Sequence, residues 1–247
     1  MTRTKNENET TMKVIARIHT DFPTKFGIPR QSGLVEALKS TIIFEPEYRN
    51  PEAFRGLEEY SHIWLIWEFS ASICDTWSPT VRPPRLGGNI RKGVFATRST
   101  FRPNPIGLSS VRLDGIEHHT ELGPLLHISG ADLMDNTPIY DIKPYIPYSD
   151  SHPEATGGFT DHIKYVMLEV DFPIQLLELI PTEKQEALIE VLRQDPRPGY
   201  QDEPHRVYGF EFSGLDIRFQ VNGDKLTVCE VVSKFDTSTL SAEQIIN

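Results

Sequence analysis

The feature that most constrains the fold is a succession of short β-rich runs, separated by glycine, proline, asparagine or aspartate. The run "MKVIARIHT" alternates apolar and polar residues, so that Met12, Val14, Ala16 and Ile18 share one face. "SHIWLIWEF", "LSSVRLDGIE", "LLHISGADL" and "YVMLEVDF" follow at short spacing. Many short strands with little helix between them are typical of a β-barrel or a sandwich. We therefore expect a mainly β protein whose N-terminal domain is a β-barrel with few short helices.

A second region begins after Pro173. "PTEKQEALIEVLRQD" places Thr182 and Gln185 at capping-box spacing ahead of an apolar stripe, which predicts a helix. "LDIRFQVNGDKLTVCEV" predicts a hairpin that turns at Asn222 and Gly223. This region is expected to form a small α+β C-terminal domain. The expected parts are a disordered tail at 1–11, the β-barrel domain at 12–172 and the C-terminal domain at 173–247.

Charge is distributed unevenly along the 247 residues, whose net charge is −10. No acidic residue lies between Asp75 and Asp114, and this window, called the basic window below, carries seven positive charges: Arg82, Arg85, Arg91, Lys92, Arg98, Arg102 and Arg112. The rest of the chain therefore carries a net charge of −17. A basic block in an acidic protein is a candidate surface for phosphates. It can equally be a solvated loop balanced by acidic neighbours in space.

Several classes of site and location are disfavoured by the sequence. The two cysteines, Cys74 and Cys229, lie far apart, which argues against a disulfide framework or a structural zinc site and fits a reducing cytoplasm. The polar N-terminus has no signal-peptide pattern, and no apolar run is long enough to span a membrane. His118 and His119 are more typical of a turn than of a metal site. We therefore expect a cytoplasmic protein without a metal.

Three polar segments are hard to explain by packing alone. They are "FGIPRQSGL", "GVFATRSTFRPNPIGLSS" with its leader "VRPPRLGGNIRKG", and "GADLMDNTPIYDIKPYIPYSD". Taken singly, each has an ordinary explanation: Arg30 can pair with a surface carboxylate, and residues 132–136 can form a turn rich in Asp and Asn. Together they suggest a site assembled from loops on a rigid β scaffold.

These segments resemble a known family. "PRQSG", "RPPRLGGN", "GVFATRSTFRPNPIGLS" and "DLMDNTPIYDIKPYIPY" resemble the TrmO (TsaA-like, YaeB) tRNA methyltransferases over roughly residues 12–170, and "DPRPGY" with the hairpin resembles the C-terminal domain of the longer members. The resemblance implies a β-barrel that binds S-adenosylmethionine without a Rossmann fold. It also implies a homodimer with the cofactor near the subunit interface. The implied reaction methylates N6 of N6-threonylcarbamoyladenosine at position 37 of tRNA, in the anticodon stem-loop.

The resemblance also assigns residues. Ser70 stands where members carry a histidine, and Asn136 stands where glycine is common. The cofactor-binding positions fall on Pro29, Arg30, Gln31, Ser70, Arg98, Leu108, Asp132, Leu133, Met134 and Asp135. An arginine fork suits the cofactor's carboxylate, so Arg98 or Arg30 is expected there, while Asp132 and Asp135 could accept from ribose or ammonium.

The reaction and the RNA suggest further candidates. Because N6 must lose a proton when it is methylated, a base is useful, and the candidate catalytic residues are Asp135 and Asp141. Side chains expected to meet tRNA phosphates or bases are Arg82, Arg85, Arg91, Lys92, Arg102, Arg197 and Tyr200.

Two other functions remain open at this point. A β-barrel RNA-binding module without catalysis would carry the same basic window but would not bind S-adenosylmethionine. A methyltransferase acting on a small metabolite would bind the cofactor but would not need that window.

Overall fold

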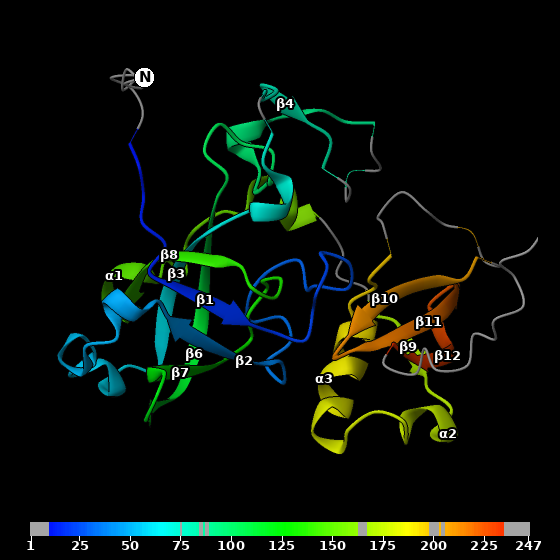
Figure 1. Ribbon diagram of the computed structural model, residues 1–247. Coiled ribbons are helices and arrows are strands. Elements are labelled where there is room, and N and C mark those ends of the chain that lie inside the picture. The colour runs from blue at the N-terminus through cyan, green and yellow to red at the C-terminus, as the bar shows by residue number, and fades with distance from the viewer. Residues whose placement is uncertain are drawn as a thin grey trace, which may run out of the picture.

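The computed structural model describes residues 10–74, 76–83, 86, 89–162, 167–197, 203 and 206–234. Apart from Thr10 and Thr11, the expected tail at 1–11 lies outside the described residues. The expected fold class is confirmed: the chain is mainly β, with a closed barrel and a separate C-terminal sheet (Figure 1). No helix in the described part of the chain is long and apolar enough to cross a membrane.

The barrel closes through six antiparallel strands in the order β1-β2-β7-β6-β3-β8. Their bounds are β1 Ala16–His19, β2 Lys39–Phe44, β3 His62–Glu68, β6 Ile106–His119, β7 Gly123–Ser129 and β8 Pro138–Pro144. Alternation sets the two faces of each strand: on β3, Ile63, Leu65 and Trp67 are buried while the residues between them are more exposed. The inward side chains of all six strands form one apolar core.

The connections carry short helices and one small hairpin. Among the described residues, the short 3-10 helices before β6 are η1 Pro46–Tyr48, η2 Pro51–Phe54, η3 Leu57–Glu59, η4 Ser70–Ser72 and η6 Val94–Ala96. The α-helix α1 Pro147–Asp150 and the 3-10 helix η7 Gly158–His162 follow β8. Asn50 caps η2 by accepting a hydrogen bond from the Glu52 N–H at 3.1 Å. β4 Thr80–Val81 and β5 Lys92–Gly93 form a two-stranded hairpin that stands away from the barrel strands (Figure 1).

The C-terminal sheet has the order β10-β11-β12-β9, with bounds β10 Tyr208–Phe212, β11 Leu215–Asn222, β12 Lys225–Ser233 and β9 Glu169–Asp171. The predicted hairpin is present, but Asn222 pairs with Lys225, so the turn residues are Gly223 and Asp224, one position later than expected. β9 lies on the N-terminal side of the expected boundary at 172/173 and yet pairs in parallel with β12. Strand periodicity identifies β9 as a strand but does not identify its partner.

Two helices accompany this sheet, α2 Ile174–Leu177 and α3 Thr182–Arg193. The predicted capping box at α3 is wrong, because Pro181 occupies the N-cap position and Thr182 is already helical. Gln185 instead donates to the carbonyls of Leu177 and Ile180, at 3.1 and 3.0 Å, and so fixes the turn that precedes the helix.

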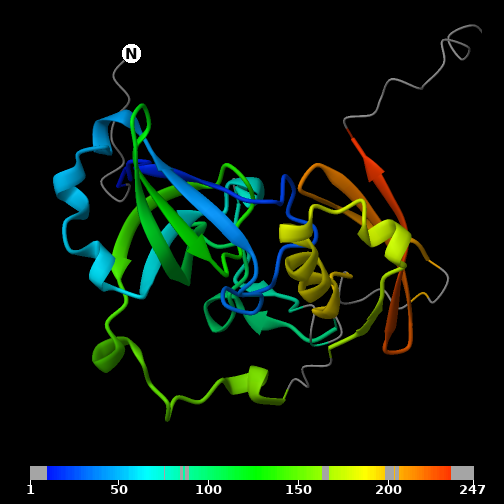
Figure 2. The same cartoon turned by 90° about the horizontal axis from the view of Figure 1, so that it is seen from below.

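The C-terminal domain has a core of its own, and one segment of the N-terminal region enters it. Phe22, Val35 and Leu38, which lie between β1 and β2, pack with the buried residues of α3 and of strands β10, β11 and β12. Figure 2 shows this connection, in blue, lying between the barrel and α3. The segment at 21–38, called the docking segment below, therefore belongs to the core of a domain far away in sequence.

Candidate functional site

The three polar segments singled out in the sequence meet beside β6. Arg98 Nη1 donates to Gln31 Oε1. The Asp132 carboxylate accepts from Ser109 Oγ at 2.6 Å and from the backbone N–H of Ser32, and it lies within electrostatic reach of Arg98. Burial raises the pKa of Asp132 above its ordinary value, against the lowering effect of these hydrogen bonds and of Arg98. One residue or more from each segment therefore belongs to a single cluster, called the Asp132 cluster below.

The barrel provides a rigid support for this cluster. Ser109 is buried on β6, and its Oγ accepts from Trp67 Nε1 at 3.0 Å while donating to Asp132. Trp67 lies directly against Gly107, where an added Cβ would stand 2.2 Å from the indole ring. A side chain at position 107 would displace the tryptophan. The glycine thus lets Trp67 hold the serine that orients Asp132.

The residues after Asp132 are engaged in other ways. Leu133 has 1% exposure and lies in the barrel core, so its side chain is covered. Met134 is half-buried, and its carbonyl accepts from Thr137 Oγ1 at 2.7 Å. The Asp135 carboxylate accepts from the Thr20 N–H at 3.0 Å and lies 3.3 Å from His19 Nδ1. Only Asp132 of this run shares hydrogen bonds with the other two polar segments.

The second candidate base, Asp141, lies on a different part of the barrel from Asp135. In the strand register Asp141 of β8 and Leu108 of β6 both pair with Ile66 of β3, so the three form one row across the sheet. Leu108 is 57% exposed, and Asp141 forms an ion pair with Lys143 at 2.9 Å. The two candidate bases thus lie on separate segments, and each is engaged with a different partner, Thr20 for Asp135 and Lys143 for Asp141.

The remaining cofactor candidates differ in where they point. Pro29 is buried, whereas Arg30 is exposed and donates to backbone carbonyls of the C-terminal domain, those of Asp195 and Arg197. Ser70 is half-buried and opens η4 directly after β3. The assignment of all these positions to the cofactor stays a prediction.

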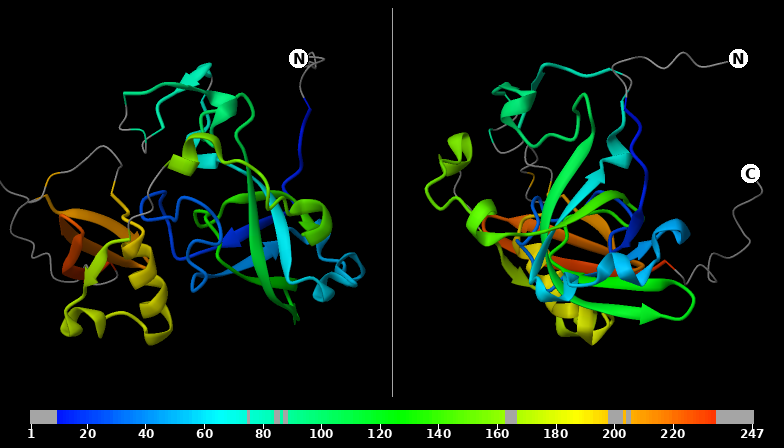
Figure 3. Two further views of the ribbon diagram at one scale, coloured as in Figure 1. Left: turned by 180° about the vertical axis from the view of Figure 1, so that it is seen from behind. Right: turned by 90° about the vertical axis from the view of Figure 1, so that its left-hand side faces the viewer.

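Some of the residues expected to meet tRNA are exposed, and others are engaged by contacts within the protein. Arg82 and Arg91 are exposed on the β4–β5 hairpin, which projects from one end of the barrel (Figure 3). Lys92 is half-buried, with its ammonium over the Phe159 ring at 5.9 Å. Arg102 instead secures its own loop by donating to the Thr97 carbonyl at 2.7 Å. Arg197 is 11% exposed and is paired with the Asp195 carboxylate, and Arg85 and Tyr200 lie outside the described residues.

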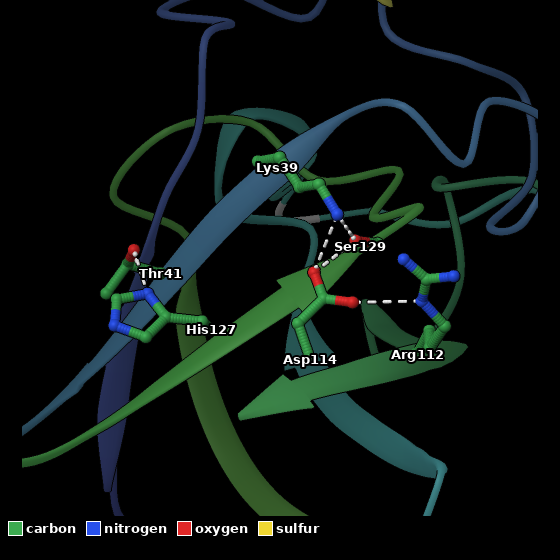
Figure 4. A network of polar contacts seen from close by, with 6 residues as sticks. All are labelled: Lys39, Thr41, Arg112, Asp114, His127 and Ser129. Atoms are coloured by element: carbon green, nitrogen blue, oxygen red, sulfur yellow. Dashed lines mark hydrogen bonds and ion pairs between the residues drawn. The ribbon is translucent and has the colours of Figure 1, made fainter. Parts of the chain in front are cut away.

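The structure also shows a polar network that the sequence did not suggest. The Asp114 carboxylate accepts from Lys39 Nζ and from Arg112 Nε, both at 2.9 Å, and from Ser129 Oγ (Figure 4). Burial alone would raise the pKa of Asp114, but these hydrogen bonds outweigh it and lower the pKa. The network borders a surface hollow of about 460 Å³ between β1, β2, β7 and α3. Its members come from three strands that are separate in sequence, so no local sequence pattern predicted the network.

The histidine pair does not form a metal site with its neighbours. His119 Nδ1 accepts from the backbone N–H groups of Glu121 and Leu122, both at 3.2 Å, and so closes the turn between β6 and β7. Over the described ranges, no three His, Cys, Asp or Glu residues are grouped so as to hold a metal ion.

Comparison with known proteins gives one consistent result. The model of the tRNA-methyltransferase O N-terminal domain matches residues 17–151, and that of the TrmO C-terminal domain matches residues 166–234. The chain is 40% identical over 215 residues to the tRNA (adenine(37)-N6)-methyltransferase of Escherichia coli K12, covering 84% of this chain and 91% of that protein. It is 37% identical over 147 residues to the "Probable S-adenosyl-L-methionine-binding protein" of Pyrococcus abyssi, covering 60% and 74%.

A solved structure agrees with the sequence comparisons. The crystal structure of TrmO from Pseudomonas aeruginosa superposes with a TM-score of 0.73 at 33% identity, covering 91% of this chain and 99% of that one. Both domains of this chain are therefore matched, in sequence and in fold, by proteins of one kind. The chain belongs to the tRNA-methyltransferase O (TrmO) family.

Proposed function

We propose that this protein is an S-adenosylmethionine-dependent tRNA methyltransferase that methylates N6 of adenine 37, and that its substrate is the N6-threonylcarbamoyl form of that base. The match to a tRNA (adenine(37)-N6)-methyltransferase, which covers 84% of this chain, supports the enzyme class and the position in tRNA. The threonylcarbamoyl group follows from the family resemblance. Because tRNA is the substrate, we place the activity in the cytoplasm.

The single observation that carries the proposal is the Asp132 cluster. It offers a guanidinium, Arg98, within electrostatic reach of a half-buried carboxylate, Asp132. Exposed apolar surface at Leu108 lies on the outward face of β6, one residue before the Ser109 that holds Asp132. S-adenosylmethionine carries a carboxylate, an ammonium, ribose hydroxyls and an adenine ring, so it needs donors, acceptors and an apolar surface close together. Within the cluster, Arg98 can donate to the carboxylate and Asp132 can accept from the ammonium or the ribose. When bound, S-adenosylmethionine supplies an electrophilic methyl group whose departure leaves a neutral thioether.

The residues of the chain then have three tasks. Arg98 is proposed to bind the cofactor's carboxylate with its planar fork, and Asp132 to accept from the ammonium or the ribose. Since the leaving group needs no proton, the main task of the protein is alignment in a dry site. The proton of N6 must still leave, and the proposed acceptors are the carboxylates of Asp135 and Asp141.

The basic window is proposed to serve the anionic substrate. Arg82, Arg91 and Lys92 on the β4–β5 hairpin are proposed to meet tRNA phosphates, which the exposure of Arg82 and Arg91 supports. The threonyl carboxylate of the modified base needs a cationic partner, for which a side chain of the same window is proposed. The negative charge on the rest of the chain would keep RNA away from other faces.

A homodimer is proposed through the outward face of β3 and β6. Ile106 and Leu108 are 38% and 57% exposed on that face, next to Ile66. Exposed apolar rows on a sheet are typical of association surfaces. Because Leu108 is also a cofactor candidate, a dimer through this face would place the cofactor near the subunit interface.

The test is transfer of a labelled methyl group from S-adenosylmethionine to tRNA. Wild-type protein should label tRNA in the presence of a metal chelator, and Arg98→Ala should label it at least about tenfold more slowly. Binding of tRNA with no methyl transfer would support the non-catalytic RNA-binding module instead.

A further inference from the structure

The docking segment is packed against the C-terminal domain at its start. Phe22 packs edge-to-face against Phe212, with ring centroids 5.4 Å apart. The Asp21 carbonyl accepts from the Ser213 N–H at 2.8 Å, and the Asp21 carboxylate lies 2.7 Å from Lys184 Nζ. This end of the segment is therefore held by main-chain, ionic and aromatic contacts at once.

The middle of the segment fits the C-terminal domain without spare room. Gly27 has a positive φ of 82°, and a Cβ added there would stand 2.2 Å from the Phe210 ring. Close backbone approach of this kind fixes the path of the chain three residues before Arg30. The other side of the loop is tied to the barrel, because the Gly33 N–H donates to the Gly130 carbonyl at 2.9 Å.

Arg30 makes a third contact with the C-terminal domain. Its Nη2 donates to the backbone carbonyls of Asp195 and Arg197, at 3.4 and 3.3 Å. Those carbonyls belong to a turn with a structure of its own: the Asp195 carboxylate accepts from Arg197 Nε at 2.8 Å and from Arg197 Nη2 at 3.0 Å. Asp195 itself is left-handed, with φ 53°, a conformation that aspartate and asparagine tolerate better than most residues.

The next two residues face the Asp132 cluster. Gln31 accepts from Arg98, and the Ser32 N–H donates to Asp132. Adjacent residues therefore bind opposite partners: Arg30 binds the C-terminal turn, and Gln31 with Ser32 binds the cluster. A displacement of Arg30 would move Gln31 and Ser32 with it, because only one or two peptide units separate them.

We propose that Arg30 is a positioning residue and that the turn at 195–197 is its support, so that the C-terminal domain sets the shape of the cofactor loop. This inference rests on the proposed function and assigns Arg30 a role other than binding the cofactor's carboxylate. The C-terminal domain then contributes to cofactor binding without touching the cofactor.

The two roles of Arg30 are distinguished by truncating the ligand. S-adenosylhomocysteine carries the amino-acid tail, whereas 5′-methylthioadenosine lacks it. If Arg30 binds the carboxylate, its replacement weakens binding of S-adenosylhomocysteine alone. If Arg30 shapes the whole loop, its replacement weakens binding of both ligands. We expect Arg30→Ala to weaken binding of both ligands by a similar factor, about tenfold, in calorimetry with the full chain.

Two further variants separate positioning from charge. Asp195→Asn keeps a residue suited to positive φ but weakens the pairing with Arg197. Like Arg30→Ala, it should lower the affinity for both ligands. Arg30→Lys keeps a donor for the carbonyls and should recover much of the affinity, which a fork that binds a carboxylate would not allow. The matched control is Lys184→Gln, which removes an ion pair at the other end of the same segment and should leave both affinities unchanged.

The outcomes are exclusive. Loss of affinity for S-adenosylhomocysteine alone would make Arg30 a carboxylate ligand and overturn the inference. Unchanged affinities in both Arg30→Ala and Asp195→Asn would also overturn it. If the wild-type chain binds neither ligand, the proposed function fails first. Thermal unfolding of each variant checks that the fold is retained, and Arg30→Lys provides the test if Arg30→Ala does not fold.

Discussion

At the scale of single residues, Asp132 and Arg98 show how the site depends on neighbours that are far apart in sequence. Asp132 is held by Ser109, which is held in turn by Trp67, and Arg98 is held by Gln31. The sequence could propose each residue by resemblance. It could not show that Trp67, Ser109 and Asp132 form one hydrogen-bonded chain within electrostatic reach of Arg98, because these residues are brought together only by the fold.

Replacement of Arg98 tests the proposed carboxylate contact. We expect Arg98→Lys to lose nearly as much S-adenosylmethionine affinity as Arg98→Ala, since a point charge does not replace a planar fork. The expected loss is about 1.5–3 kcal/mol, which calorimetry can measure. Arg91→Lys, on the β4–β5 hairpin, is the control and should bind the cofactor like the wild type. Affinity close to wild type in Arg98→Lys would mean that Arg98 contributes charge alone or lies outside the site.

Asp114 predicts a pH dependence of stability. Its folded-state pKa is lowered, so its contribution is complete above the ordinary value of 3.8 and is lost as the pH falls through the lower folded-state value. At pH 7 we expect Asp114→Asn to lower the free energy of unfolding by about 1–2 kcal/mol. The difference between variant and wild type should shrink as the pH is lowered below 3.8, through the folded-state pKa of Asp114.

Urea unfolding at several pH values measures that difference. Glu58→Gln, an exposed residue of η3, is the control and should change stability little at any pH. A difference for Asp114→Asn that is constant with pH would contradict the role assigned to its charge.

At the scale of elements, most strands could be predicted, because alternation and glycine or proline punctuation are local signals. Asn50 followed by Pro51 is likewise a local signal for the start of a helix, and η2 begins at Pro51. The wrong predictions concern what a strand or side chain contacts, not whether the strand or helix exists. β9 pairs with β12 instead of the barrel, and Gln185 binds preceding carbonyls instead of forming a capping box. Such choices depend on tertiary contacts that no local pattern contains.

The β4–β5 hairpin predicts a salt-dependent phenotype. The triple change of Arg82, Arg91 and Lys92 to alanine should weaken tRNA binding at low salt. It should also lower the log–log salt slope by about 0.7–0.9 for each tRNA phosphate that the variant no longer neutralises. S-adenosylmethionine affinity should stay the same. Removing three charges elsewhere, at Lys13, Arg55 and Lys225, should leave the slope unchanged. An unchanged slope in the hairpin variant would mean that another surface holds the tRNA.

At the scale of the whole molecule, the docking segment joins the barrel core to the C-terminal core. By sequence it lies within the barrel domain, but its buried side chains pack in the C-terminal core. The sequence predicted two domains but treated them as neighbours only. Because Phe22, Val35 and Leu38 complete the C-terminal core, we expect that domain to lose part of its apolar core, and stability with it, if residues 173–247 are produced alone. Local periodicity could not show this dependence.

The proposed dimer is also a property of the whole molecule. Light scattering should give a mass near twice the 28.1 kDa of the chain. Ile106→Glu should lower that mass to a monomer, because it places a charge on the outward face of β6. Val232→Glu is the control: Val232 of β12 has the same 38% exposure as Ile106 and should leave the mass unchanged. A wild-type mass near 28.1 kDa would refute the dimer.

The central claim is methylation of a modified adenine at position 37, and nucleoside analysis tests it most directly. The protein is incubated with S-adenosylmethionine and either tRNA that carries N6-threonylcarbamoyladenosine or the same tRNA with plain adenine, and digested nucleosides are measured by mass spectrometry. We expect one added methyl group on N6 of threonylcarbamoyladenosine and none on plain adenine. A methyl group on any other nucleoside, or equal methylation of both tRNAs, would contradict the proposed function.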